Sequence, residues 1–261
     1  MSRAMWWLSD AWVMTLRNLR RIPRQPDLLI FGVIQPILFI VLFNYVFGGA
    51  MSSAPGVSGG DYAQFLMPGV FVQTVVFGAV ASAAIGIAED MQKGLMDRFR
   101  SLPMSRSSVL LGRTISDTVR NTLTVAVMVA VGMVVGFRFQ GSVLAGLAAV
   151  VLMLLFGFAL SWLAILIGLS VGSVEAAQSA GMIWLFPLTF ASSAFVPQQT
   201  MPGWLQGFVQ YNPITVTVDT LRALFNGTSA GSAGWQMAAW MIGLVAVFLP
   251  LSVAKFRRAS V

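Results

Sequence analysis

The sequence predicts an all-α integral membrane protein that crosses the bilayer six times. Of its 261 residues, 57% are hydrophobic and only 10% are charged, whereas a typical soluble domain has about 25% charged residues. The apolar residues are gathered into six long runs, each near or above the roughly 20 residues that a helix needs to cross the hydrocarbon. No stretch is polar enough to form a separate soluble unit. We therefore expect residues 1–261 to form a single transmembrane domain.

The six apolar runs define the predicted spans. The fourth run is longer than a simple crossing requires, so we expect it to tilt or to project beyond the membrane. The first run is too long, and its leading polar segment too extended, for a cleaved signal peptide. We therefore keep it as a span. The predicted spans are residues 28–47, 65–88, 119–137, 143–171, 176–196 and 235–254.

Residues 1–27 precede the first span and show an amphipathic pattern. Leu8, Trp12, Leu16 and Leu19 recur at three- and four-residue steps, while arginines lie mostly on the other side. Such a helix lies in the headgroup layer, with tryptophan at the interface and arginine toward anionic lipid. The alternative is a cytoplasmic helix that packs on protein.

Basic residues predict the orientation of the chain. Five arginines precede the first span, five basic residues lie between the second and third spans, and three follow the last span. The segments assigned to the outside contain only Arg138 and Arg222. The positive-inside rule therefore places both termini in the cytoplasm, with the chain in the bacterial plasma (inner) membrane. Because the net charge of +7 lies beside the apolar runs, it indicates membrane flanks, and we expect no nucleic acid partner.

The residue types exclude several chemistries. The sequence has no Cys and no His, so a disulfide framework, a thiol nucleophile, a zinc site and an imidazole base are excluded. It has no glycine-rich turn that ends in Gly-Lys-Ser/Thr, so it has no P-loop for ATP. No pair of carboxylates converges near one membrane face, which disfavours a membrane enzyme. We expect no cofactor or metal in this chain, and any ATP and Mg²⁺ on a partner subunit.

Residues 89–113, between the second and third spans, hold most of the non-terminal charge. Leu95, Phe99 and Leu102 recur at helical spacing, and Pro103 ends the pattern. A short amphipathic helix here would transmit force from a motor subunit to both spans. The alternative is an ordinary basic loop that only fixes topology. The candidate coupling residues are Glu89, Asp90, Lys93, Asp97, Arg98, Phe99, Arg100, Pro103 and Arg106.

Residues 197–232 are only half apolar and too often interrupted by proline to form a span. Short re-entrant helices in the outer leaflet are expected, because backbone at that depth must be buried or face water. Asp219 and Arg222 are spaced to pair on such a helix, either as an outer gate or as a structural pair. Asp117 and Arg120 repeat this spacing at the inner end of the third span, where we expect them to snorkel. The candidate outer residues are Pro197, Pro202, Asn212, Pro213, Asp219 and Arg222.

Aromatic and amide side chains in the second and fifth spans are candidates for a substrate path. Aromatic rings give adaptable apolar contact, and a few amides orient polar groups. The alternative is plain helix packing and lipid contact. Gly78, Ser82 and Gly86 are spaced for close helix approach, within this chain or between two chains. The candidate path residues are Gln73, Thr74, Phe77, Trp184, Phe186 and Phe190.

Several blocks of sequence, taken together and in order, resemble ABC-2 type transporter permeases, especially those of the daunorubicin-resistance type. The blocks cover nearly the whole chain. The resemblance implies six spans, an N-terminal interfacial helix, a coupling helix between the second and third spans, re-entrant helices before the sixth span, and a separate ATP-binding subunit. The first block begins with residues 17–20 (Arg-Asn-Leu-Arg) and runs to Pro36. The others are residues 65–70 (Phe-Leu-Met-Pro-Gly-Val), 89–106, 195–205, 211–215 (Tyr-Asn-Pro-Ile-Thr) and 218–222 (Val-Asp-Thr-Leu-Arg).

The expected function is that of the transmembrane permease subunit of an ABC exporter. It would move an amphipathic drug or lipid-like substrate out of the cell, as in antibiotic efflux, driven by ATP hydrolysis on a separate subunit. A second permease half, the same or a different chain, and membrane lipid are the other expected partners. The alternative is an autonomous secondary transporter or channel, which usually has a carboxylate near the middle of the bilayer. The acidic residues here lie at span ends or in loops.

Overall fold

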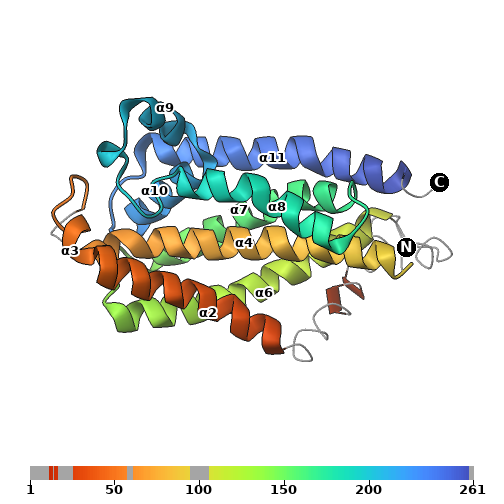
Figure 1. The fold of residues 1–261 in the computed structure, drawn as a ribbon, viewed down its shortest axis with the longest axis horizontal. Coiled ribbons are helices and arrows are strands. Elements are labelled where there is room, and N and C mark those ends of the chain that lie inside the picture. Colours follow the sequence, from red (N-terminus) through yellow and green to blue (C-terminus); the bar gives the residue numbers. More distant parts are fainter. Residues whose placement is uncertain (1–11, 14, 17–25, 58–60, 95–105, 259–261) are drawn as a thin grey trace.

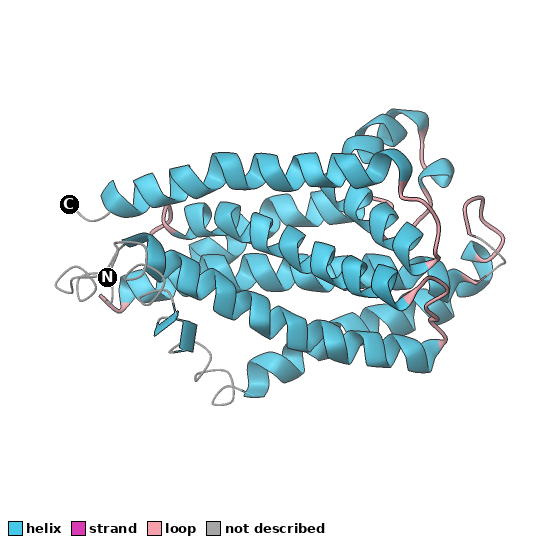
Figure 2. Ribbon diagram, turned by 180° about the vertical axis from the view of Figure 1, so that it is seen from behind, coloured by secondary structure: helices cyan, strands magenta, loops and turns pink. Residues whose placement is uncertain are grey.

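The computed structural model is a bundle of long helices, and it describes residues 12–13, 15–16, 26–57, 61–94 and 106–258. Within these ranges no residue is in a strand, which confirms the all-α class (Figure 2). The elements, in chain order, are α2 (Pro26–Leu42), the π-helix η2 (Phe43–Phe47), α3 (Gly48–Met51), α4 (Tyr62–Gln92), α6 (Arg106–Val135), α7 (Val143–Gly168), α8 (Val174–Phe190), the 3₁₀-helix η4 (Gln198–Thr200), α9 (Gly203–Tyr211), α10 (Pro213–Phe225) and α11 (Gly231–Arg258).

The outer faces of the bundle are apolar, as in an integral membrane protein. Exposed side chains include Val134, Val143 and Ile183, which are 87%, 82% and 77% accessible. Lipid accommodates apolar surface of this extent, whereas a soluble monomer rarely exposes it. Among the described residues, five helical stretches are long and apolar enough to cross a membrane: Val33–Met51, Tyr62–Gln92, Leu110–Val135, Val143–Gly168 and Gly231–Phe256. The 17 residues of α8 span only about 25 Å, yet this helix runs beside α4 in the bundle (Figure 1).

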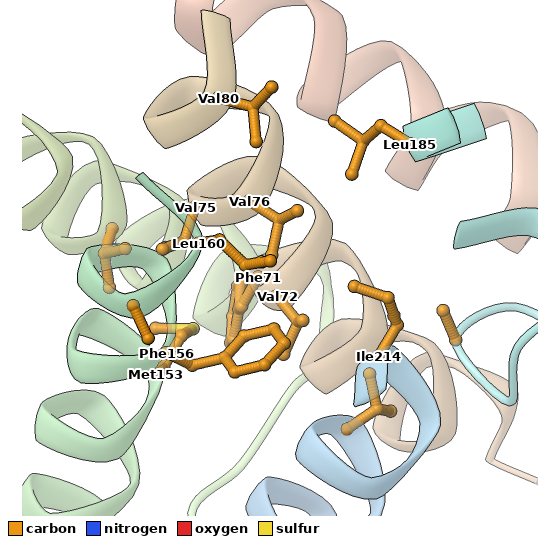
Figure 3. Close-up of a cluster of buried hydrophobic side chains, with 14 of the residues drawn as sticks. Phe71, Val72, Val75, Val76, Val80, Met153, Phe156, Leu160, Leu185 and Ile214 are labelled. Atoms are coloured by element: carbon orange, nitrogen blue, oxygen red, sulfur yellow. The ribbon is translucent and has the colours of Figure 1, made fainter. Parts of the chain in front are cut away.

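The core of the bundle is built around α4. This helix packs against α2, α6, α7, α8 and α10, and most of its residues are buried. Figure 3 shows Val75 and Val76 of α4 together with side chains from α7, α8 and α10. Gly157 and Gly168 of α7 let the two backbones approach closely, since a Cβ at Gly168 would lie 2.6 Å from the carbonyl oxygen of Ala84.

The helices extend further into the predicted inner segment than the sequence indicated. Residues 89–92 form the last turn of α4, and residues 106–113 form the first two turns of α6. Both helices continue past their apolar runs because Asp90 and Arg113 pair with each other, so charge at these positions does not require a loop. The chain between the two helices, residues 93–105, is called the connection below; its residues 95–105 lie outside the described residues.

The fifth predicted span, 176–196, is too long at its outer end because α8 stops at Phe190. Pro187 lies in its last turn, and the side chain of Asn212 bonds to the carbonyl groups of Leu188 and Ala191. These carbonyls therefore have partners without a further helical turn. The residues that follow run as bends and turns toward η4.

The two ends of the described chain lie at the same end of the bundle. Residues 12–13 and 15–16 and the last turn of α11 are found there, while α3 and α9 lie at the opposite end (Figures 1 and 2). Most of the predicted interfacial helix over residues 1–27 falls outside the described residues. Within it, residues 12–13 and 15–16 are helical, and Thr15 contacts α6.

Candidate functional site

Asn212 joins the end of α8 to the beginning of α10 near the end of the bundle opposite the termini. Its Nδ2 donates hydrogen bonds to the carbonyl oxygens of Leu188 and Ala191, both at 2.7 Å. Its Oδ1 accepts from the backbone N–H of Ile214 at 2.8 Å, which caps α10. Because Asn212 is only 2% exposed, these bonds are sheltered and fix the start of the segment 191–197, which we call the outer linker.

Ser193 anchors the outer linker to α10. Its backbone N–H donates to Thr215 Oγ1 at 3.1 Å, and its hydroxyl donates to Asp219 Oδ1 at 2.8 Å. Arg222 donates from Nη1 to the same Asp219 oxygen at 2.7 Å and from Nη2 to the Ser193 carbonyl at 3.1 Å. Asp219 and Arg222 thus form a pair, and both contact the linker.

Arg222 and Tyr62 connect this cluster to α4. The carbonyl oxygen of Phe65 accepts from Arg222 Nε at 3.3 Å and from Nη2 at 3.1 Å. The guanidinium also lies 3.8 Å from the centroid of the Phe65 ring, a cation–π contact. The Tyr62 hydroxyl donates to the carbonyl oxygen of Phe195 at 2.7 Å. Side chains from two helices therefore fix the backbone on which Phe195 lies.

The phenylalanines of α4, α8 and the outer linker contact one another in series. Phe77 of α4 meets Phe186 of α8 edge to face, with ring centroids 5.3 Å apart. Phe186 stacks on Phe190 at 5.9 Å, and Phe190 contacts Phe195 at 5.4 Å. These separations are typical of favourable aromatic pairs.

Phe195 extends this series to the first span. Its ring stacks on Phe43 at 4.7 Å and on Phe39 at 6.0 Å, and Phe43 contacts Phe47 at 5.3 Å. Phe43 and Phe47 are the first and last residues of η2. π-helical segments are frequent at functional sites. We name the seven rings the aromatic strip: Phe39, Phe43, Phe47, Phe77, Phe186, Phe190 and Phe195.

The aromatic strip is buried at its centre and accessible at its edges. Phe195 is 3% exposed, whereas Phe47, Phe186 and Phe190 are 42%, 44% and 46% exposed. Parts of the strip on both α8 and η2 therefore lie at the surface of the bundle.

Three of the six predicted path residues lie on the strip, namely Phe77, Phe186 and Phe190. The others do not join it through any ring contact of the described residues. Gln73 and Thr74 are buried in α4, where the Thr74 hydroxyl donates to the carbonyl of the preceding turn. Trp184 of α8 is half-buried, and its indole N–H has no hydrogen-bond partner among the described residues.

Four members of the strip are not among the predicted path residues. Phe39, Phe43 and Phe47 recur every four residues, a spacing that is visible in the sequence but lies within an apolar run that equally predicts a plain span. Phe195 gave no such signal, because it was assigned to the end of the fifth span rather than to a linker.

The predicted prolines begin short outer helices. Pro197 precedes η4, Pro202 precedes α9, and Pro213 is the first residue of α10, a position where proline loses no helical hydrogen bond. Pro197 and Pro202 lie apart from the hydrogen bonds made by Asn212, Asp219 and Arg222.

At the end of the bundle near the termini, the candidate coupling residues have different environments. Glu89 and Lys93 form an exposed ion pair at 2.7 Å. Asp90 is 5% exposed and bonds to Arg113, so it does not face a partner subunit. In the described part of the chain, no three His, Cys, Asp or Glu side chains are grouped to hold a metal. Asp97, Arg98, Phe99, Arg100 and Pro103 lie outside the described residues, and Arg106 begins α6 with a side chain that is not described.

The sequence matches a known family of membrane transporters. The model of the ABC-2 type transporter family matches residues 9–226. The chain belongs to this family. The predicted resemblance is thus confirmed, and the aromatic strip, Asn212, Arg222 and the Asp90–Arg113 pair all lie inside the matched region of this ABC-2 transporter.

Individual relatives of this ABC-2 transporter are permeases. The chain is 36% identical to the daunorubicin resistance ABC transporter permease protein DrrB1 of Streptomyces coeruleorubidus, over 90% of this chain and 81% of that protein. It is 27% identical to a probable doxorubicin resistance ABC transporter permease protein, DrrC, of Mycobacterium tuberculosis, over 94% and 87%. It is 26% identical to the putative transport permease ycf38 of Cyanophora paradoxa, over 85% and 76%. The chain is therefore a multi-pass transporter permease of the membrane rather than an enzyme.

Proposed function

We propose that this permease is the membrane half of an ABC exporter that moves amphipathic aromatic drugs, or lipid-like molecules, out of the cell. The aromatic strip is the observation that carries this proposal. Phe77 lies midway along α4, whereas Phe47 lies next to α3 at the end opposite the termini. The strip thus leads from the middle of the bundle toward one end, which we assign to the outside.

The chemistry of the strip suits an amphipathic substrate. Stacking on exposed ring faces binds planar apolar groups without requiring a fixed charge. The charged groups near the strip, Asp219 and Arg222, already bond to each other and to the outer linker. The names of two relatives refer to resistance to daunorubicin and doxorubicin, which supports an aromatic drug as substrate of this chain.

Energy would enter at the inner end from a separate ATP-binding subunit, which would hold ATP and Mg²⁺. We infer that its contact is the connection over 93–105 with the adjoining exposed pair Glu89–Lys93. A second permease half, the same or a different chain, completes the transporter. In this arrangement α8 is the fifth of six crossings, and both termini are in the cytoplasm beneath the plasma membrane.

The test is to purify the tagged chain from its host in mild detergent and to identify the proteins that accompany it by mass spectrometry. We expect an ATP-binding subunit, which should be lost when Arg98→Glu and Arg100→Glu are combined, because reversed charges repel the former partner surface. The matched control combines Arg257→Glu with Arg258→Glu at the end of α11. Normal partner binding and normal export by the first double variant would refute the coupling assignment. Recovery of the chain alone would favour an autonomous transporter.

A further inference from the structure

The inner halves of α4 and α6 are joined by polar side chains. Arg113 of α6 donates from Nη1 to Asp90 Oδ2 at 2.5 Å and to the carbonyl oxygen of Gly86 at 2.8 Å. Its Nη2 donates to the carbonyl oxygen of Ser82 at 3.4 Å. The side chains of Arg113 and Asp90 are only 16% and 7% exposed. One guanidinium therefore binds two successive turns of α4.

The small residues of α4 make room for this contact. A Cβ at Gly86 would overlap the guanidinium of Arg113. Two turns further along, Arg120 donates to the carbonyl oxygen of Gly78 at 3.3 Å, and a Cβ at Gly78 would lie 2.8 Å from the amide oxygen of Asn121. The predicted stripe of Gly78, Ser82 and Gly86 is thus an internal seam that receives polar side chains of α6.

Asp117 completes a buried ionic group around Arg113. Its Oδ2 lies 3.9 Å from Arg113 Nε, and neither atom has a hydrogen-bond partner among the described residues. The hydroxyl of Ser82 is also buried and has no hydrogen-bond partner among the described residues. A buried ionic group often adds no more stability than apolar packing of the same volume, and in some proteins its role is to fix one arrangement of the helices that carry it. This group is therefore better suited to hold geometry than to add stability.

The ionic group lies close to two segments at the cytoplasmic end, namely the connection between α4 and α6 and the N-terminal residues that pack on α6. α4 and α6 are the helices on either side of the connection over 93–105. On the neighbouring face of α6, the Thr15 hydroxyl donates to the carbonyl oxygen of Gly112 at 3.2 Å, and the Ser116 hydroxyl donates to the carbonyl oxygen of Thr15 at 3.1 Å. The inner end of α6 therefore contacts α4 through one face and the N-terminal helix through the next.

We propose that Arg113 and Asp90 are positioning residues that lock the inner ends of α4 and α6 into one rigid unit, so that displacement of the connection over 93–105 moves both spans together. Without this lock, either helix would shift alone and the outer end of α4, with its contacts to Arg222 and the strip, would not follow. The inference rests on the proposed ATP-driven function, because it assigns the step between hydrolysis and movement of the spans.

The first test compares Gly86→Ala and Arg113→Lys with the wild type. Gly86→Ala displaces the guanidinium without changing any charge, and Arg113→Lys keeps the charge but cannot bond Asp90 and two carbonyl groups at once. The control is Gly243→Ala in α11, where no atom lies within 4 Å of the added Cβ.

The readout is doxorubicin exported per ATP hydrolysed, measured on the complex with its ATP-binding subunit in proteoliposomes. Coupling between sites commonly amounts to about 5- to 150-fold, so we expect both variants to lower the ratio at least about five-fold while ATP hydrolysis and partner binding persist. A ratio equal to that of the wild type in either intact variant complex would overturn the proposal.

The second test measures the lock directly and does not depend on transport. Because the sequence has no cysteine, spin labels can be placed at Gln92→Cys and Ile115→Cys, two exposed positions on α4 and α6. In the chain alone in nanodiscs, we expect one narrow distance distribution for the wild type and a broader one for Gly86→Ala. Identical distributions would overturn the lock. Failure of the wild-type complex to export would instead contradict the proposed function and leave the lock to be judged by these distances.

Discussion

Asn212 connects two elements through a single amide group. The amide nitrogen donates hydrogen bonds to two carbonyl groups at the end of α8, and the amide oxygen accepts one from the backbone N–H of Ile214 in the first turn of α10. Its position before Pro213 predicted an interruption near this point. The sequence could not show that its partners, Leu188 and Ala191, lie 24 and 21 residues earlier in the chain.

Replacing Asn212 with Ala should lower the stability of the folded chain. Loss of an N-cap costs about 1 kcal/mol, and each of the two carbonyl groups left without this partner costs about 1–3 kcal/mol, so we expect a loss of about 3–7 kcal/mol. Asn212→Ser keeps the capping oxygen and should recover about 1 kcal/mol of this loss. The stability of both variants is measured by the midpoint of denaturation in mixed detergent micelles. Full recovery by Ser would show that the bonds to Leu188 and Ala191 contribute nothing.

For Asp219 and Arg222, the spacing in the sequence predicts their mutual pair but not their contacts with distant residues. Spacing alone predicted that Asp219 and Arg222 would pair, as they do at 2.7 Å. It did not predict that Ser193 and Phe65, which are 29 and 157 residues away from Arg222, would share this guanidinium. These contacts favour a positioning role for the pair, because its hydrogen-bonding groups are directed at the backbone of the outer linker and of α4.

At the scale of elements, apolar runs located the long helices but not their ends. Helix boundaries depend on contacts such as Asp90–Arg113, which lengthens α4 and α6, and Asn212, which shortens α8. The π-helix η2 has no distinctive residue pattern, and its effect is seen only when Phe43 and Phe47 contact other rings. The strip was therefore half predictable: its members on α4 and α8 were candidates, and its members on the first span and the linker were not.

The exposed edge of α8 should bind substrate rings. Each aromatic pair is worth about 0.5–1.5 kcal/mol, which corresponds to about a two- to twelve-fold change in affinity. We therefore expect Phe190→Leu to raise the KM for doxorubicin export by this factor with little change in ATP hydrolysis. Phe208→Leu in α9, where the ring is 52% exposed and outside the strip, is the matched control. Equal KM values for the two variants would exclude Phe190 from the path.

At the scale of the whole molecule, the orientation in the membrane can be tested at two positions. Gln199 is the middle residue of η4, shortly before α9 at one end of the bundle, and Lys255 lies in the last turn of α11 at the other; both are exposed. Since the natural chain has no cysteine, Gln199→Cys and Lys255→Cys each provide a single thiol. A membrane-impermeant maleimide should label Gln199→Cys in intact cells and Lys255→Cys only after permeabilisation. The reverse pattern would invert the topology.

The dependence of α8 on residues that follow it has a consequence for biogenesis. The helix is short for a crossing, and its last carbonyls bond to Asn212, while Ser193 bonds to Thr215, Asp219 and Arg222. These partners follow α8 in the chain and are therefore synthesised after it. We expect the end of α8 to stay incompletely capped until α10 has been synthesised, so that the two helices reach their final positions together.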